Sequence, residues 1–362
     1  MRYFLPAALL LALAACSGDS GDGHRFRVEE IEGVRTARTT GGPRFSDELF
    51  TYQERLTLQQ DPAVPGSVVA RPVAFTTDGN GYYVADGEVD RIAVFDASGR
   101  YVRSLGSQGE GPGQWMNLVL QDAREGTVSS IDYSRGRLIR YTAAGRLREE
   151  LQVPIEWRAG TFAIFPLLDR RSVLLNLTVR PDGMQEAMGM VLTDRLRRHW
   201  SVTTERFGPE AGAFPRVRFE PELGIVLSTG LDGRLDFYPV DGSPVHRIAV
   251  EGLPAPAWSR VGHDDAGFWW LRIPESSSEE VDPAAVAGGP RPGRWRILSP
   301  EGEYLGITTT PPLDEVSELQ SYQLPVSVAA GSLMGVVTDP AGGRTELRVW
   351  RLVPAVPGLV WP

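Results

Sequence analysis

The sequence predicts an all-β fold, and three observations support this class. The 362 residues include 40 glycines and 28 prolines, a density that long helices tolerate poorly. No segment keeps an apolar period of 3.6 residues over a useful length. Instead, short runs rich in β-branched and aromatic residues alternate with turns of Gly, Pro and Asp. These runs are 82–85, 91–95, 137–141, 234–238 and 294–298.

Composition narrows the class of function. Hydrophobic residues make up 42% of the chain and charged residues 23%, as in an ordinary globular protein. The net charge is −9, which argues against a nucleic-acid partner because phosphate is bound mainly by Lys and Arg. The chain contains no lysine, so all 37 basic residues are arginines. Schiff-base lysine chemistry and a phosphate loop with its lysine are therefore excluded.

A strand–turn–strand motif repeats along the chain, with a glycine where a positive φ eases the turn. Clear copies lie at 95–100, 141–146, 238–242 and 298–303, a degenerate copy without its glycine at 190–195, and a sixth copy at 346–350. The period is about 48 residues, and a polar insertion at 276–293 explains one longer interval. Each unit has room for about four strands, which is the size of a propeller blade.

We therefore expect a six-bladed β-propeller of four-stranded blades over 24–353, followed by a C-terminal tail at 354–362. The last unit stops after its third strand. We expect residues 25–31 to supply the missing outer strand, because an N-terminal strand in the last blade closes the ring and removes an open sheet edge. Two stacked β-sandwich domains are the alternative, and they would not explain a phase kept through six copies.

One unit carries a more specific pattern. The segments 81–86 (GYYVAD), 91–96 (RIAVFD) and 111–115 (GPGQW), together with Gly99, resemble one NHL repeat with its junction to the next. The resemblance covers this unit, is partial across 126–146 and is faint beyond. It implies a six-bladed, NHL-like propeller of the kind found among exported bacterial lipoproteins.

The N-terminal sequence predicts localisation in the bacterial cell envelope. Residues 1–15 fit a signal peptide, since their apolar run is shorter than the about 20 residues of a membrane-spanning helix. The run ends in Leu-Ala-Ala before Cys16, the only cysteine. This resembles a lipobox and implies a lipid on Cys16, with 16–23 as a flexible tether. Ser17 favours the outer membrane over the inner. A secreted protein with a chance cysteine is the alternative.

No catalytic or metal-binding set can be nominated, and we expect no cofactor. The glycine-rich stretch 106–113 lacks the lysine of a phosphate loop, so we interpret it as a connection between blades. The repeat phase puts His199 and His246 on outer strands and His24 on the closing strand. Only His263 lies near an inner strand, and one histidine does not make a zinc site.

Two further groups could be mistaken for ligand-binding residues. Carboxylates near the ends of inner strands could hold calcium, but we interpret them as turn-forming residues; they are Asp78, Asp122, Glu220, Glu222, Asp264 and Asp265. Trp269 and Trp270 are adjacent on a second strand, so their side chains point to opposite faces. At least one of them is expected to pack between blades.

Two classes of function remain. We expect a monomeric, lipid-anchored propeller that binds a protein, peptide or glycan at the cell envelope. The alternative is a metal-dependent enzyme that resembles propeller lactonases or lyases. Fold alone does not decide between them, because function depends on the site.

A candidate binding surface follows from the repeat phase. Inner strands of a propeller all begin at one rim of the central channel. Counting back from the turn into each second strand gives five candidate residues at this rim: Arg71, Asn117, Arg216, Trp258 and Tyr322. The third unit lacks a clear turn marker, and Arg158 lies in the corresponding approach. Arg can bind a carboxylate with two hydrogen bonds, and Trp and Tyr offer flat apolar faces. If these side chains point outward instead, the insertion at 276–293 is the next candidate.

The lipid anchor is directly testable. Cys16→Ser removes the thiol to which the lipid would be attached, so we expect loss of acyl labelling and release of exported protein from the membrane fraction. The measurement is palmitate labelling followed by membrane fractionation. A Cys16→Ser protein that is still labelled would overturn the lipobox interpretation.

Overall fold

The computed structural model consists of β-strands joined by turns and loops. The structure describes residues 23–124, 126–152, 161–166, 172–179, 185–192, 197–204, 216–220, 224–228, 233–238, 246–253, 258, 260–264, 266–274, 291–314, 327–329, 331–338 and 345–361. The predicted signal peptide, Cys16 and most of the tether lie outside these residues. Within them, no helix is long and apolar enough to cross a membrane.

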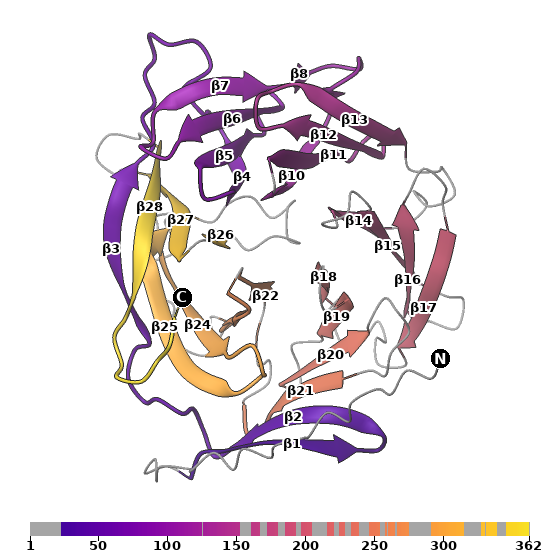
Figure 1. Ribbon diagram of the computed structural model, residues 1–362, viewed down its shortest axis with the longest axis vertical. Coiled ribbons are helices and arrows are strands. Elements are labelled where there is room, and N and C mark those ends of the chain that lie inside the picture. Colours follow the sequence, from indigo (N-terminus) through magenta and orange to yellow (C-terminus); the bar gives the residue numbers. More distant parts are fainter. Residues whose placement is uncertain are drawn as a thin grey trace, which may run out of the picture.

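Six sheets, the blades, stand around a central axis (Figure 1). In each of the first three blades, four consecutive strands lie side by side, the first at the centre and the fourth at the outside. Blade 1 contains β4 (Pro72–Thr77), β5 (Gly81–Asp86), β6 (Arg91–Asp96) and β7 (Tyr101–Leu105). Blade 2 contains β10 (Leu118–Arg124), β11 (Thr127–Asp132), β12 (Arg137–Thr142) and β13 (Leu147–Gln152). Blade 3 contains β14 (Thr161–Pro166), β15 (Ser172–Val179), β16 (Gln185–Leu192) and β17 (Arg197–Thr204).

Blades 4 and 6 include strands from near the start of the chain, whereas blade 5 consists of four consecutive strands. Blade 4 contains β18 (Arg216–Glu220), β19 (Gly224–Ser228), β20 (Arg234–Tyr238) and β21 (His246–Val250), extended by β2 (Val34–Thr40) and β1 (Arg25–Ile31). Blade 5 contains β22 (Arg260–His263), β23 (Trp269–Arg272), β24 (Arg291–Leu298) and β25 (Tyr304–Leu313). Blade 6 contains β26 (Ser327–Ala329), β27 (Ser332–Thr338), β28 (Thr345–Pro354) and β3 (Phe50–Thr57).

The sixth blade takes its outer strand from β3, near the start of the chain. The ladder between β28 and β3 is antiparallel and runs from Phe50↔Pro354 to Thr57↔Arg348. The expectation that residues 25–31 would fill this place is wrong. That segment is β1, which pairs with β2 through a two-residue turn at Glu32 and Gly33. A local hairpin closes a much shorter loop than a pairing with the far end of the chain.

The N-terminal hairpin extends blade 4 and leads the chain to blade 6. β2 pairs in parallel with β21, from Arg35↔His246 to Thr39↔Val250. The chain then follows β25, because the backbone N–H groups of Arg44 and Leu49 donate to the carbonyls of Tyr304 and Ile307, each at 3.0 Å. The segment from β2 to β3 therefore joins blades 4, 5 and 6 from the outside (Figure 1).

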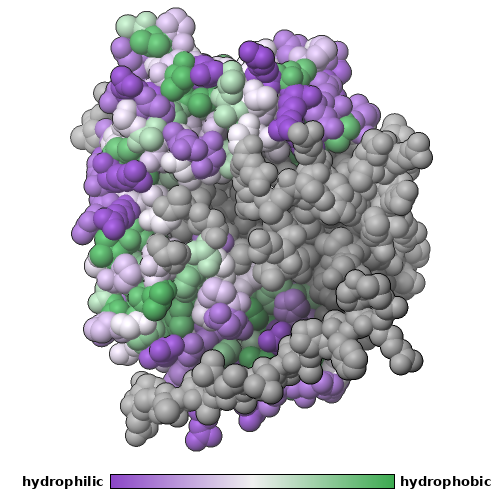
Figure 2. Space-filling model, in the orientation of Figure 1, coloured by the Kyte–Doolittle hydropathy of each residue, from purple (hydrophilic) through white to green (hydrophobic). Residues whose placement is uncertain are grey.

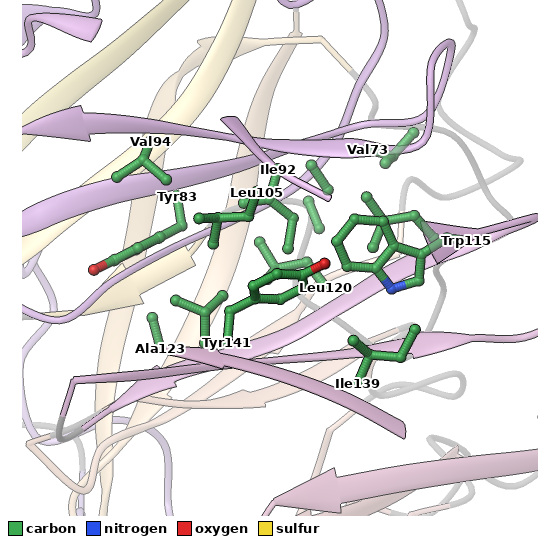
Figure 3. Packing of buried hydrophobic residues seen from close by; sticks show 14 residues of the cluster. Val73, Tyr83, Ile92, Val94, Leu105, Trp115, Leu120, Ala123, Ile139 and Tyr141 are labelled. Atoms are coloured by element: carbon green, nitrogen blue, oxygen red, sulfur yellow. The ribbon is translucent and has the colours of Figure 1, made fainter. Parts of the chain in front are cut away.

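The hydrophobic core lies between the blades. Figure 3 shows the cluster between blades 1 and 2, in which Ile92, Leu105, Trp115, Leu120 and Ile139 are at most 1% exposed. All four strands of blade 1, the three inner strands of blade 2 and the connection at Trp115 supply this packing. In β5 all six residues are buried. Apolar clusters thus join blades 1 and 2, 4 and 5, 5 and 6, and 6 and 1, and such burial stabilises by about 25 cal/mol per Å².

The two adjacent tryptophans of β23 show this two-sided packing. Trp269 belongs to the cluster shared with blade 4, in which it meets Phe237 edge to face at 5.1 Å. Trp270 belongs to the cluster shared with blade 6, in which it stacks on Phe50 at 5.9 Å. The expectation that at least one would pack between blades is confirmed, and both do so.

The repeated turn is formed as the sequence predicted. Gly99, Gly145 and Gly302 have φ of 80°, 87° and 94°, in the left-handed region that glycine adopts readily. Each follows a third strand and precedes the outer strand of its blade. Gly242 and the insertion at 276–290 lie outside the described residues.

The segment expected as a C-terminal tail packs against the ring. Val356 is 8% exposed, and the backbone N–H of Ala355 donates to the carbonyl of Leu49 at 2.9 Å. The ring of Trp361 contacts those of Phe50 and Phe268, both at 4.6 Å. Residues 355–361 therefore bridge blades 5 and 6.

Phe50 provides a test of the closure. It is 2% exposed, lies at the start of β3 and contacts two tryptophans. We expect Phe50→Ala to lower the free energy of unfolding by about 3–5 kcal/mol, because it leaves a cavity between blades 5 and 6. The measurement is urea unfolding. The matched control is Thr51→Ala at the adjacent exposed position, with an expected change within about 0.5 kcal/mol. Equal effects would contradict this role of β3.

Candidate binding rim

The predicted rim residues that the structure describes stand at the start of inner strands. Arg71 directly precedes β4, Asn117 directly precedes β10 and Arg216 is the first residue of β18. Arg71 and Asn117 occupy equivalent positions, since their carbonyls accept from the backbone N–H groups of Gly87 and Tyr133, both at 2.9 Å. Both side chains are exposed. Arg158 and Tyr322 lie outside the described residues.

Trp258 has a different environment from the one expected. It is 2% exposed and belongs to the apolar cluster between blades 4 and 5. A large aromatic ring gains more from burial between two blades than from contact with water. Its ring is therefore not available as a flat platform at the surface, and we leave it out of the binding surface.

A buried carboxylate organises the rim of blade 1. Asp86 at the end of β5 is fully buried and accepts from the backbone N–H groups of Ala70 and Arg71, both at 3.1 Å. It also pairs with Arg91 at 3.3 Å. The guanidinium of Arg91 in turn donates to the carbonyl of Val68 at 2.5 Å. These bonds fix the loop before the inner strand to the turn between the second and third strands.

Blade 2 repeats this arrangement with Asp132 and Arg137. Asp132 is fully buried and pairs with Arg137 at 2.8 Å. Arg137 also pairs with Glu150 at 2.7 Å and donates to the carbonyl of Gln114 at 2.7 Å. Burial lowers the pKa of Arg137, but its hydrogen bonds to Asp132 and Glu150 outweigh this and leave the pKa above its usual value. Arg137 is thus a permanent charge that holds the connection between blades 1 and 2.

The rims of the two blades are joined to each other. Asp90 is 7% exposed and adopts φ of 43°, a left-handed conformation that non-glycine residues seldom take. Its carboxylate accepts from the backbone N–H of Leu118 at 3.0 Å and from the amide of Gln108 at 3.4 Å. The turn after β5 is therefore tied directly to the start of β10, and the two blades present one continuous edge.

Apolar side chains project from this edge. Val68, Val89, Met116 and Tyr133 are 40%, 41%, 44% and 37% exposed, although they stand in loops whose backbones are firmly held. Arg71 lies beside them, 54% exposed and 3.8 Å from Glu88. We call these five side chains, with Asn117, the binding rim. Over the visible face of blades 1, 5 and 6, hydrophobic and hydrophilic residues are interspersed (Figure 2).

The glycine-rich stretch 106–113 lies at the junction behind the rim. It connects β7 to β10, and its ends form a short parallel pair between β8 (Ser107–Gln108) and β9 (Gln114–Trp115). The indole of Trp115 is fully buried and donates to Ser130 at 3.1 Å. A side chain at Gly106 would collide with this indole. The interpretation as a blade connection is confirmed.

Two of the carboxylates near the ends of inner strands, those of Asp78 and Asp264, have described side chains, and both form turns as expected. Asp78 accepts from the backbone N–H groups of Asn80 and Gly81 at 2.9 and 3.0 Å. Asp264 accepts from the backbone N–H of Phe268 at 2.9 Å and from the indole of Trp270 at 2.7 Å. The side chains of Asp122, Glu220, Glu222 and Asp265 are outside the description.

The histidines lie on different elements of the fold. His199 and His246 lie on the outer strands β17 and β21, and His263 lies on the inner strand β22, as expected. His24 does not close the ring but precedes the hairpin, where it contacts Glu303 at 3.0 Å. Burial lowers the pKa of His246, and Arg35 lowers it further. Among the described residues, no group of three or more His, Cys, Asp or Glu could hold a metal ion.

Comparison with known proteins agrees with this architecture. A family model, DUF5128, for 6-bladed beta-propeller proteins matches residues 73–167. A member of the DUF4221 family from Bacteroides vulgatus has a TM-score of 0.55 at 10% identity, with 85% of this chain and 99% of that chain covered. A protein of Bacteroides fragilis described as exported has a TM-score of 0.51 at 11% identity, over 84% and 95% of the two chains.

One further solved structure is similar to this chain at a lower TM-score. Virginiamycin B lyase from Staphylococcus aureus has a TM-score of 0.39 at 13% identity, with coverage of 82% and 88%, and this likeness carries no argument about activity. No curated protein matches this chain. The sheet topology and the family match together define the chain as a six-bladed β-propeller.

The buried Asp–Arg pairs were not anticipated as site residues, although the sequence contains a signal for them. Asp86 and Arg91 are separated by the same interval as Asp132 and Arg137. Among the described strands, blades 1 and 2 have an aspartate as the last residue of the second strand and an arginine as the first residue of the third. The exposed apolar residues carry no such signal, because exposure of a loop residue depends on neighbouring loops.

The rim of blade 1 depends on Asp86. We expect Asp86→Ala to lower the free energy of unfolding by about 3 kcal/mol, since it leaves Arg91 and three backbone N–H groups without this acceptor. The measurement is equilibrium unfolding in urea. Glu88→Ala, at a side chain that is 63% exposed, is the control and should change stability by less than about 0.5 kcal/mol. A loss no larger than that of the control would contradict this role.

Proposed function

We propose that this protein is a lipid-anchored propeller of the bacterial cell envelope that binds a protein, peptide or glycan at the binding rim. The observation that carries the proposal is the contrast between rigid backbone and exposed apolar side chains at that rim. Val68, Val89, Met116 and Tyr133 face solvent on loops that are tied down by buried carboxylates.

Such an arrangement suits recognition for two reasons. Exposed apolar side chains that a partner covers are removed from water, and this burial contributes to affinity. Loops that are already ordered lose little conformational entropy on binding, so more of the contact energy contributes to affinity. Arg71 and Asn117 add a charge and an amide beside the apolar residues, and these can fix the orientation of a ligand.

The anchor rests on the sequence of the first 23 residues. A lipid on Cys16 would hold the propeller at the membrane through the tether, with β1 as the first strand. A propeller held in this way meets partners that share the membrane or its adjoining compartment.

The rim is tested by charge and polarity reversal. We expect Arg71→Glu combined with Val89→Asp to abolish capture of envelope partners, because a carboxylate replaces a cation and an apolar contact is lost. The measurement is crosslinking in envelope fractions, pull-down and identification of the captured molecules. Arg71→Glu with Arg216→Glu extends the test to blade 4. Every variant should unfold at the same temperature as the wild type, since these positions are exposed or at a strand end.

Matched controls lie away from the rim. Arg146→Glu reverses an exposed charge in the turn between β12 and β13, at the opposite end of blade 2. Val102→Asp changes a valine on β7 that is 43% exposed, close to the value for Val89. Both control proteins should capture the same partners as the wild type. Capture that survives the rim reversals in folded protein would overturn the proposed site.

A further inference from the structure

The N-terminal hairpin has an open strand edge at the outside of the molecule. β1 is the last strand of the six-stranded sheet, and no other strand of the described residues pairs with it. Val28 in its middle is 47% exposed, and the side chain of Arg27 is 60% exposed. An open sheet edge is a template for pairing with another strand.

The turn fixes which backbone groups of β1 face this open edge. Glu32 and Gly33 have φ of 52° and 78°, so the hairpin has a two-residue turn with positive φ at both positions, which is type I′. Such a turn closes on hydrogen bonds between its flanking residues, Ile31 and Val34. Hydrogen-bonded and non-bonded pairs then alternate along the ladder. The N–H and C=O groups of Phe26, Val28 and Glu30 therefore point away from β2.

The sequence of β1 is complementary to itself when it is reversed. It reads Arg-Phe-Arg-Val-Glu-Glu-Ile, with positive residues before Val28 and negative residues after it. If two copies pair antiparallel with Val28 opposite Val28, Arg27 of each lies opposite Glu29 of the other. The outward backbone groups then match at three residue pairs, which gives about six hydrogen bonds. Edge charges usually prevent association, but charges arranged symmetrically about one residue favour it in this single register.

We propose that two copies of this chain form a two-fold symmetric dimer by antiparallel pairing of their β1 strands, centred on Val28. The occupant of the open edge is a second copy because the strand supplies its own opposite charges at the required positions. Arg27 and Glu29 already form an ion pair at 3.1 Å within one chain, so in the dimer four alternating charges lie on one face. This proposal replaces the expectation of a monomer. It does not depend on the binding rim, which belongs to blades 1 and 2.

Disulfide trapping in the full-length chain tests the register. At the centre of the pairing, the two Cα atoms of residue 28 would be about 5.5 Å apart, within the range that a disulfide spans. We expect Val28→Cys to form a covalent dimer on mild oxidation of membranes. Glu30→Cys is the matched control, because it lies on the same face of β1 but would be about 13 Å from its symmetry mate along the strand direction. The wild-type chain controls for Cys16.

Charge exchange tests the cause of the pairing. Arg27→Glu in the Val28→Cys background places like charges opposite each other twice, so we expect the dimer yield at low protein density to fall about tenfold. Adding Glu29→Arg to that variant restores opposite charges, and the yield should recover. Arg38 lies opposite residue 27 in the β1–β2 ladder, so the exchange keeps an acidic neighbour for it.

The crosslinking results distinguish the proposed dimer from its alternatives. Crosslinking at residue 28 but not 30, lost with Arg27→Glu and regained with the double exchange, supports the dimer. Equal crosslinking at both positions, or none at residue 28 in protein with wild-type thermal stability, overturns it. A disulfide at residue 28 that links the chain to a different protein also overturns it. Light scattering of the purified full-length wild-type chain in detergent should independently give twice the monomer mass, and a monomer mass would contradict the proposal.

Discussion

The propeller depends on one antiparallel ladder that joins opposite ends of the chain. Seven residue pairs between β28 and β3 complete the sixth blade, and without them two sheet edges would stand open. The apolar clusters on the two sides of blade 6, shared with blades 5 and 1, depend on this ladder, because β3 and β28 contribute residues to both of them. Trp270 illustrates this dependence: it is fully buried only because Phe50 from β3 and Trp361 from the C-terminal segment cover it.

Local patterns in the sequence were sufficient for the blades but not for the closure. The turn glycines, the alternation of short strands and the common phase of about 48 residues come from contacts within one unit, and the structure has each of them where it is described. The run 25–31 has a strand-like composition, which favours it as the closing strand when the sequence is considered alone. The sequence of 50–57 has it too, and only the type I′ turn at Glu32 and Gly33 shows that the earlier run folds on itself.

In the candidate site, too, local features could be predicted from the sequence and contacts between blades could not. Counting along the repeat located Arg71 and Asn117 at equivalent points of two blades, because position within a blade is a local property. It also selected Trp258, whose ring the structure buries between blades 4 and 5. Side-chain exposure depends on which loops of the next blade lie alongside, and spacing in the sequence contains no information about this. The Asp86–Arg91 and Asp132–Arg137 pairs have the same interval, so the sequence does contain a local signal for them.

The position of β3 has a consequence for how the chain reaches its native state. Residues 50–57 leave the ribosome early but find their partner only after residues 345–354 have been made and, if the chain is exported, translocated. Contacts of such long sequence separation are slow to form. Until then residues 50–57 have no strand partner in blade 6. An unfolded chain in a secretory channel is compatible with this state. The late partner thus delays closure of the ring until residues 345–354 are in the same compartment as residues 50–57.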